Sequence, residues 1–364
     1  MKYVRMATEI ELPEEYGYDK IKNNLSESSV TGQTLQSLGL TIPTDLILVY
    51  NEHRGGGRLR ELIVAGSGLS KDDVLITLGV AGALFIISTS QLTKKDHLVV
   101  VRPNYATNIE TPKAIGCNDT YVDLSFELGF AIDLSSIASA IKPSTRIVSV
   151  TCPHNPTGVV IPRETLNSLD ELTKAKGCLL LVDETYRDIQ CGEKLPLAAS
   201  LGDHIISVSS LSKSYGIPGI RCGWLITQNE ALQEEFLAAK EQINISGSVI
   251  DEWIAEQVLE RHESILFQTT QQMETRLDLV EAWIEKEDLL EWVRPSGGVV
   301  CFPRMKVEPP GGTTQFYERL LLKHATYVGP GHWFEMPDTF FRLGLPTLDQ
   351  LQAGMDAISQ ALRT

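Results

Sequence analysis

The sequence is poor in the features that mark disulfide-bonded, metal-binding and membrane-spanning proteins. Its six cysteines are scattered without a C-x-x-C pair, and most stand within apolar runs, so we expect reduced thiols in the core and no bound metal. No uncharged apolar run approaches about 20 residues. Residues 1–6 begin no apolar segment of a secretory signal. We therefore expect a cytoplasmic protein with no membrane partner.

Basic charge is also scarce. The 32 Lys and Arg residues face 47 Asp and Glu residues, which gives a formal net charge of −15. Nucleic acids and anionic membranes attract clustered basic residues, so this balance argues against both and favours neutral or cationic small molecules. The 364 residues contain no internal repeat or low-complexity tail, and they suffice for one principal domain with a smaller one beside it.

Regular patterns follow a polar, irregular start over residues 1–40. Residues 73–227 alternate short β-branched runs with amphipathic segments, which is typical of βαβ units around a mainly parallel sheet. Residues 251–288 have apolar residues at helical spacing and predict long helices that link two domains. The patterns predict strands at 74–79, 97–102, 146–152, 179–183, 204–209 and 221–227, a turn at 80–82, a helix at 83–92, and a small α+β domain that contains 295–302, 326–331 and 340–345.

The stretch from Ser210 to Trp224 sets one lysine, Lys213, among small hydroxyl residues, followed by glycines and Arg221. A lysine in such a place forms a Schiff base with an aldehyde. Ser210, Ser212 and Arg221 offer hydrogen-bond donors to a phosphate. Pyridoxal phosphate carries both groups. A surface lysine before a glycine-rich loop is the alternative for this stretch taken alone.

Two further stretches place polar residues at the ends of hydrophobic strands. Residues 155–158 read Asn-Pro-Thr-Gly, a tight turn that aims the side-chain amide of Asn155. The predicted strand 179–183 ends on Asp183, and Tyr186 follows three residues later. A buried carboxylate is costly unless it meets a charged partner. A pyridinium nitrogen is such a partner.

Taken in order, these motifs resemble the class I/II aminotransferases, a family of fold-type-I pyridoxal-phosphate-dependent enzymes. The matching stretches are Y-x-x-x-x-G-x-x-x-L-R from Tyr50, T-x-G at 77–79, P-x-Y at 103–105, N-P-T-G at 155–158, D-E-x-Y at 183–186, S-x-S-K and P-G-x-R-x-G from Ser210, and F-x-R-L with Arg342. The resemblance implies an α/β fold whose large domain has a mainly parallel seven-stranded sheet flanked by helices, beside a small α+β domain. It implies boundaries at 1–45 for a lead-in that joins the small domain and the active-site mouth, 46–250 for the large cofactor-binding domain, and 251–364 for an interdomain helix and the small domain.

The resemblance also assigns chemistry to five side chains. It implies that Lys213 forms the Schiff base with pyridoxal phosphate and later removes the substrate's α-proton. Asp183 would keep the ring nitrogen protonated. Asn155 and Tyr186 would hydrogen-bond the phenolic oxygen, and Tyr105 would stack on the pyridine ring.

A phosphate site and a second subunit follow from the same resemblance. The groups expected on the phosphate are the side chains of Ser210, Ser212 and Arg221 and the backbone amides of Gly79, Val80 and Ala81. Backbone amides are needed because Ala81 stands where many relatives have Ser or Thr. Tyr50 would reach the phosphate bound by the neighbouring subunit. We therefore expect a homodimer with active sites at the subunit interface.

The expected substrate is an L-amino acid, which yields a keto acid. The resemblance places the planar guanidinium of Arg342 on the α-carboxylate, with Asn155 beside it, and Glu27 at a cationic side chain. Residues 242–248, where dicarboxylate-specific relatives recruit an arginine, contain no basic residue. Aspartate and glutamate are therefore not favoured. With Glu27 and Glu184 as possible anions, we expect a basic or polar amino acid such as arginine.

Each site residue also has an ordinary structural interpretation. The alternatives are a solvated loop residue for Glu27, a strand-end tyrosine for Tyr50, a core tyrosine for Tyr105, a turn residue for Asn155, a helix cap for Asp183 and a solvent-facing strand arginine for Arg342. We expect His154 to be a loop histidine rather than a catalytic base. Trp333 and Phe334 would either wall the pocket or pack in the core.

The predicted activity is that of an aminotransferase acting on an α-amino group. The alternative is a cyclase, lyase or oxidase of an amino acid, for example an arginine-derived one, because the same motifs serve all these reactions. A transcription regulator that binds pyridoxal phosphate would need a basic N-terminal domain. A non-catalytic dimerisation scaffold would need an unreactive Lys213.

Overall fold

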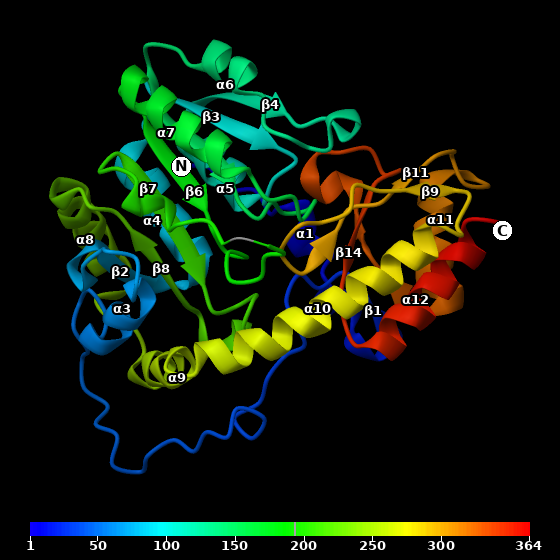
Figure 1. Ribbon diagram of the computed structural model, residues 1–364, viewed down its shortest axis with the longest axis horizontal. Helices are drawn as coiled ribbons and strands as arrows, with labels where there is room; N and C mark the ends of the chain where they lie inside the picture. Colours follow the sequence, from blue (N-terminus) through cyan, green and yellow to red (C-terminus); the bar gives the residue numbers. More distant parts are fainter. Residues whose placement is uncertain (193) are drawn as a thin grey trace.

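A seven-stranded sheet forms the centre of the computed structural model, which describes residues 1–192 and 194–364 (Figure 1). Its strand order is β2-β8-β7-β6-β5-β3-β4, and only β8 runs antiparallel to its neighbours. The strands are β2 (Val74–Leu78), β3 (His97–Arg102), β4 (Asn118–Asp123), β5 (Thr145–Thr151), β6 (Leu179–Asp183), β7 (Ile205–Ser210) and β8 (Cys222–Ile226). The expectation of a mainly parallel seven-stranded sheet is confirmed.

Both faces of this sheet are covered by helices, as the alternation within a single strand shows. In β3, Val99 and Val101 pack into one buried cluster, whereas Leu98 and Val100 pack into another on the opposite face. Helices α6 (Leu134–Ala140) and α7 (Arg163–Lys176) contribute to the first cluster. Helices α4 (Gly79–Gln91), α5 (Thr107–Ile115) and α8 (Glu230–Asn244) contribute to the second.

The C-terminal part of the chain forms a separate core beside the sheet. Helix α10 (His262–Ile284) runs between the two parts, preceded by α9 (Val249–Leu259) (Figure 1). The remaining elements of this part are β9 (Leu290–Glu291), β10 (Val300–Cys301), β11 (Arg304–Met305), α11 (Gly312–His324), β12 (Thr326–Tyr327), β13 (Gly329–Pro330), β14 (Phe341–Gly344) and α12 (Leu348–Ala361). The long helices predicted over 251–288 are confirmed. The domain limits at 45 and 250 stay predictions.

The lead-in, residues 1–45, is attached to this C-terminal part. It contains two four-residue helices, α1 (Ala7–Ile10) and α2 (Pro13–Tyr16), a 3₁₀ turn at Tyr18–Lys20, and β1 (Asn23–Asn24). Strand β1 pairs in parallel with β12. A long connection without helix or strand then extends away from the body of the molecule before α3 (Gly57–Val64) (Figure 1).

Two expectations about local structure are wrong. Helix α4 begins at Gly79 rather than at 83, because the small residues at 79–82 form its first turn instead of a separate turn. Cys191 is exposed, because it lies in the loop after β6 and not in an apolar run, whereas the other five cysteines are buried. All six are free thiols. None of the helices in the described ranges combines the length and apolar composition that a membrane crossing requires.

Candidate active site

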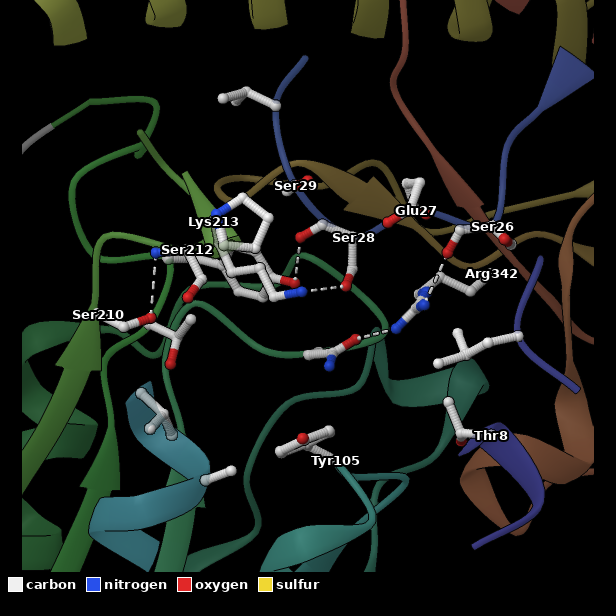
Figure 2. Close-up of a pocket in the computed structure, with 18 of the residues that line it drawn as sticks. Thr8, Ser26, Glu27, Ser28, Ser29, Tyr105, Ser210, Ser212, Lys213 and Arg342 are labelled. Atoms are coloured by element: carbon white, nitrogen blue, oxygen red, sulfur yellow. Dashed lines mark hydrogen bonds between the residues drawn. The ribbon is translucent and has the colours of Figure 1, made fainter. Parts of the chain in front are cut away.

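Most of the predicted site residues line one cavity of ≈ 650 Å³, a volume suited to a small ligand (Figure 2). Those on its wall are Glu27, Val80, Ala81, Tyr105, Asn155, Asp183, Tyr186, Ser210, Ser212, Lys213, Arg221 and Arg342. Gly79 is not among the lining residues, but it is the first residue of α4 and directly precedes Val80. Tyr50 lies elsewhere, on the connection before α3, with 79% of its surface exposed.

The parallel sheet explains why residues so distant in sequence meet. Asp183 and Ser210 are the last residues of β6 and β7, while Asn155 and Tyr105 follow β5 and β3 closely. Neighbouring parallel strands end at the same edge of a sheet. Ligands of open α/β sheets bind in the crevice beyond these carboxyl ends.

Lys213 projects into the cavity from the turn after β7. Its Nζ donates a hydrogen bond to Ser28 Oγ at 2.9 Å (Figure 2). Burial and the positive charge of Arg342 lower the pKa of Lys213 to about 8. A larger fraction of this amine is therefore neutral near pH 7 than in an exposed lysine. A neutral amine is the form that attacks an aldehyde and accepts a proton.

Asp183 is a buried carboxylate that forms no ion pair with the described residues. Thr185 donates to Asp183 Oδ1 through its backbone N–H at 3.1 Å and its hydroxyl at 2.5 Å. Burial raises the pKa of Asp183, and the hydrogen bonds from Thr185 and Asn108 oppose that rise. The carboxylate lines the cavity, so a protonated ring nitrogen would supply the missing positive charge.

Arg342 presents an incompletely paired guanidinium. Its Nη2 donates to the Ser26 carbonyl at 2.8 Å and its Nη1 to Asn155 Oδ1 at 3.2 Å, while the buried Nε has no partner among the described residues. The guanidinium lies 5.0 Å from the ring centroid of Phe334, which orients it. No carboxylate of the described chain pairs with this buried cation. It therefore suits a carboxylate ligand.

The opposite end of the cavity suits a phosphate. Ser210, Ser212 and Arg221 lie there with the N-terminus of α4, which has no side-chain cap and so leaves amides free for an anion. Arg221 has φ +45°, an uncommon backbone conformation for a side-chain-bearing residue. A Cβ at Gly223 would lie 2.5 Å from the Gly79 carbonyl carbon, so glycine allows this close approach.

The aromatic and amide groups between these two ends complete the wall. Tyr186 is buried, and its hydroxyl donates to the Ser28 carbonyl at 2.8 Å. Burial raises the pKa of Tyr186 to about 12, which keeps the phenol protonated. Asn155 uses its Oδ1 for Arg342, so its Nδ2 donors stay available to a ligand. Tyr105 stands on the same cavity wall (Figure 2).

A pyridoxal phosphate fits this arrangement in three places. An amine is present for its aldehyde, a buried carboxylate for its ring nitrogen, and an anion site for its phosphate. The sequence model described as Aminotransferase class I and II matches residues 48–358.

The chain belongs to the class I and II aminotransferases. It is a pyridoxal-phosphate-dependent transferase. Among curated relatives of this family, the chain is 28% identical over 360 residues to capreomycidine synthase of Streptomyces vinaceus, covering 95% of this chain and 91% of the relative. It is 29% identical over 307 residues to arginine-pyruvate transaminase AruH of Pseudomonas aeruginosa, covering 80% and 77%.

Solved structures of the family agree with the fold. A PLP-dependent aminotransferase from Streptococcus suis superposes with a TM-score of 0.88 at 27% identity, over 94% of both chains. The PLP-dependent cyclase OrfR superposes with a TM-score of 0.88 at 26% identity, over all of this chain and 98% of the other. The family thus includes relatives named for two different reactions.

One further prediction about the site, that of Glu184, is wrong in the structure. Glu184 does not line the cavity, because successive residues at the end of β6 point to opposite sides of the sheet. Its buried carboxylate accepts a hydrogen bond from the Ala198 backbone N–H at 3.3 Å, and burial raises its pKa to about 7. The alternative interpretation of Tyr50 as a strand-end tyrosine is excluded, because residues 46–50 form no strand.

The surroundings of His154, Trp333 and Phe334 distinguish their roles. His154 is buried, and its two ring nitrogens contact Thr157 Oγ1 and the Pro103 carbonyl. Burial lowers its pKa to about 4. It is therefore a structural residue of the turn, as expected. Phe334 lines the cavity, whereas Trp333 is buried in the core and donates its Nε1–H to Glu11 at 2.7 Å.

Sequence reasoning missed the polar residues that hold these side chains in place. Ser28 contacts both Lys213 and Tyr186, Ser26 contacts Arg342, and Thr185 contacts Asp183. Thr185 stands inside the D-E-x-Y motif, so its position next to Asp183 was a usable signal. Ser26 and Ser28 belong to no motif, and only the folded path of the lead-in brings them here.

Proposed function

We propose that the enzyme transfers the α-amino group of a cationic L-amino acid, of which arginine is the model, to yield a keto acid. The observation that carries this proposal is the joint presence of Lys213 and the unpaired Nε of Arg342 in one cavity. Such a reaction requires an amine that transfers the α-proton and a guanidinium that binds the α-carboxylate.

Lys213 holds and moves the proton at the α-carbon. Its lowered pKa keeps part of the amine unprotonated near neutral pH. Ser28 Oγ accepts a hydrogen bond from Nζ and so directs it. When bound, pyridoxal phosphate supplies the aldehyde that takes up the amino group and the ring that accepts the electrons left at the α-carbon.

The remaining residues bind and orient. Asp183 would hold the ring nitrogen of the cofactor, Asn155 and Tyr186 its phenolic oxygen, and Tyr105 its ring face. Ser210, Ser212, Arg221 and the backbone amides of Gly79, Val80 and Ala81 would hold its phosphate. Arg342, with Asn155 beside it, holds the α-carboxylate. These contacts fix which bond at the α-carbon is broken.

The cationic side chain is supported by the charge left in the cavity. Lys213, Arg221 and Arg342 are each assigned to the cofactor or to the α-carboxylate. The carboxylates that remain without an assigned partner are those of Glu9, Glu14 and Glu27. Asn24 Nδ2 donates to Glu27 Oε1 at 3.3 Å, and the described residues give this carboxylate no ion pair. Two relatives are named for arginine or a capreomycidine product, which agrees with this choice.

Cyclisation of a cationic amino acid that carries a leaving group, such as a hydroxyl, on its β- or γ-carbon is the second candidate. Capreomycidine synthase matches 95% of the chain and the cyclase OrfR all of it, whereas AruH matches 80%. Both candidates begin with proton removal by Lys213, and they differ in what happens afterwards at the β- and γ-carbons.

Product identification separates the two candidates. The purified holoenzyme is mixed under anaerobic conditions with L-arginine or with L-β-hydroxyarginine, whose hydroxyl can leave as water, and the products are identified by mass spectrometry. Transamination gives the keto acid of arginine and the aminated form of the cofactor. A cyclic product with the nitrogen retained would assign the enzyme to the second candidate, and ammonia release or an oxygen requirement would exclude both.

A homodimer completes the proposed enzyme. Tyr50 follows three exposed apolar residues, Ile47, Leu48 and Val49, and this segment lies beside residues 244–250 in a shallow hollow. An exposed apolar surface of this kind favours a protein partner. We propose that a second copy covers it and receives Tyr50 at its phosphate. Tyr50→Phe should weaken cofactor binding about tenfold without changing the sedimentation coefficient of the dimer.

A further inference from the structure

The lead-in forms an acidic wall of the active-site cavity. This wall, here called the lead-in wall, consists of Thr8, Glu9, Leu12, Glu14 and Tyr18. Figure 2 shows Thr8 of α1, like Glu27 and Arg342, on the side of the cavity away from Ser210 and Ser212. The wall is therefore at the substrate end and not at the phosphate end.

Two carboxylates of this wall have no cationic partner in the described chain. The nearby Arg5 donates to the Glu15 carboxylate at 2.9 Å and to the Glu9 carbonyl at 3.0 Å, so it does not pair with the carboxylates of Glu9 or Glu14. Glu9 is half-buried, and its charge is close enough to Lys213 to oppose the lowering of that pKa. Glu14 contacts Tyr18 at the mouth.

The buried Arg342 determines which part of a bound amino acid would lie near these carboxylates. Its unpaired Nε, together with Nη1 and Nη2, suits the α-carboxylate of an amino acid. Once that carboxylate is bound there, the side chain of the substrate must use the other walls of the cavity. The lead-in wall carries two of the three carboxylates that the proposed roles leave unassigned, and Glu27 is the third.

Glu11 anchors the lead-in wall from behind. It stands between α1 and α2, and its Oε2 lies 2.7 Å from Trp333 Nε1 and 2.8 Å from His332 Nε2. Its carbonyl accepts a hydrogen bond from Tyr327 OH at 2.6 Å. Helices of four residues are not stable alone. These contacts therefore decide where Glu9 and Glu14 lie.

We propose that Glu9 and Glu14 bind the cationic end of the substrate side chain, and that Glu11 is the positioning residue that holds them at the cavity. The proposal rests on the proposed function, since it names the residues that select a basic amino acid. The lead-in would thus select the substrate side chain, whereas residues at the strand ends of the sheet carry out the reaction.

Binding without turnover gives the most direct test. In the holoenzyme of Lys213→Ala, the dissociation constants of L-arginine and L-citrulline are measured by calorimetry. Citrulline has nearly the same shape but lacks the positive charge. We expect arginine to bind more tightly, and Glu9→Gln or Glu14→Gln in the same background to reduce that preference about tenfold or more. Glu171→Gln, which removes an exposed carboxylate on α7 outside the cavity, should leave the preference unchanged.

The outcomes separate the two proposals. If the Lys213→Ala protein does not distinguish arginine from citrulline, the cationic substrate itself is wrong. If it does distinguish them and the Glu9→Gln/Glu14→Gln protein keeps the full preference, the role of the lead-in wall is overturned while the proposed function stands. If Glu27→Gln abolishes the preference while Glu9→Gln and Glu14→Gln both keep it, recognition belongs to Glu27 and not to the lead-in wall.

Glu11→Gln tests the positioning role. We expect the preference for arginine to fall by several-fold while the absorption spectrum of the bound cofactor stays unchanged. A purely structural role would weaken both ligands equally and leave their ratio intact, which would overturn the assignment of Glu11.

Discussion

The two ends of the cavity are built in different ways. The cofactor end consists of residues at strand ends of one sheet, held by backbone pairing along β3, β5, β6 and β7. The substrate end includes two four-residue helices whose place depends on side-chain contacts such as those of Glu11. The comparison suggests that the chemistry is fixed by the sheet, whereas the choice of substrate is set by a segment that can vary without disturbing it.

The largest expected effect is at Lys213. Lys213→Ala should slow the half-reaction with L-arginine by about 10²–10⁴-fold, because it removes the group that moves the α-proton. Rates are followed by stopped-flow absorption of the cofactor. Lys176→Ala, at the exposed end of α7, is the control and should be as fast as the wild type. A Lys213→Ala enzyme that retains the wild-type rate would contradict the assigned role.

The second-largest effect on the rate is expected at Asp183. Asp183→Asn should reduce the rate by about 10²–10³-fold, since a fixed charge facing the ring nitrogen is lost. The neighbouring Glu184→Gln is a matched control, because this carboxylate is equally buried but lies outside the cavity. Equal losses in the two variants would show that burial, and not position, explains the effect.

A smaller effect is expected at Glu27. Glu27→Gln should raise the Michaelis constant for L-arginine by up to about tenfold and change kcat little, because the carboxylate contributes to binding rather than to proton transfer. The corresponding constants for an uncharged amino acid such as L-methionine should not change. A fall in kcat with both substrates would show that Glu27 contributes to the chemical step and not to binding of the substrate side chain.

The smallest expected effect is on the melting temperature, through the contact between Glu11 and His332. A hydrogen bond with Asp338, together with one to Glu11, raises the pKa of His332 to about 9 despite partial burial. Because the pKa of His332 in the folded protein is above its ordinary value, protonated His332 stabilises the fold. This stabilisation is complete below about pH 6.5 and is lost as the pH rises through about 9. The melting temperature of the wild type should exceed that of Glu11→Gln by about 1–3 °C at pH 6. That difference should shrink by pH 10, and a constant difference would contradict the account.

The cofactor end could be predicted from the sequence because its residues follow strands. The motifs around Asn155, Asp183 and Lys213 each stand at the end of a hydrophobic run, and the ends of parallel strands meet. Glu184 was misplaced although the alternation of side chains along a strand could have excluded it. The early start of α4 was missed because its first turn contains residues that also form turns.

The substrate end could not be predicted in the same way. Glu9 and Glu14 lie in a polar stretch without a motif, and their positions depend on contacts more than 300 residues away, such as Glu11 with Trp333 and β1 with β12. Ser26 and Ser28 reach Arg342 and Lys213 only through this path. Spacing along the chain carries no information about such long-range contacts.

Two amino acids with side chains of opposite charge test the cationic substrate directly. The holoenzyme is mixed under anaerobic conditions with L-arginine or L-aspartate at equal concentration, and the conversion of the cofactor absorption band is timed. We expect rapid conversion with arginine and little with aspartate, because the described lining of the cavity offers unpaired carboxylates and no unassigned cation to a substrate side chain. Comparable rates with the two amino acids would contradict this expectation.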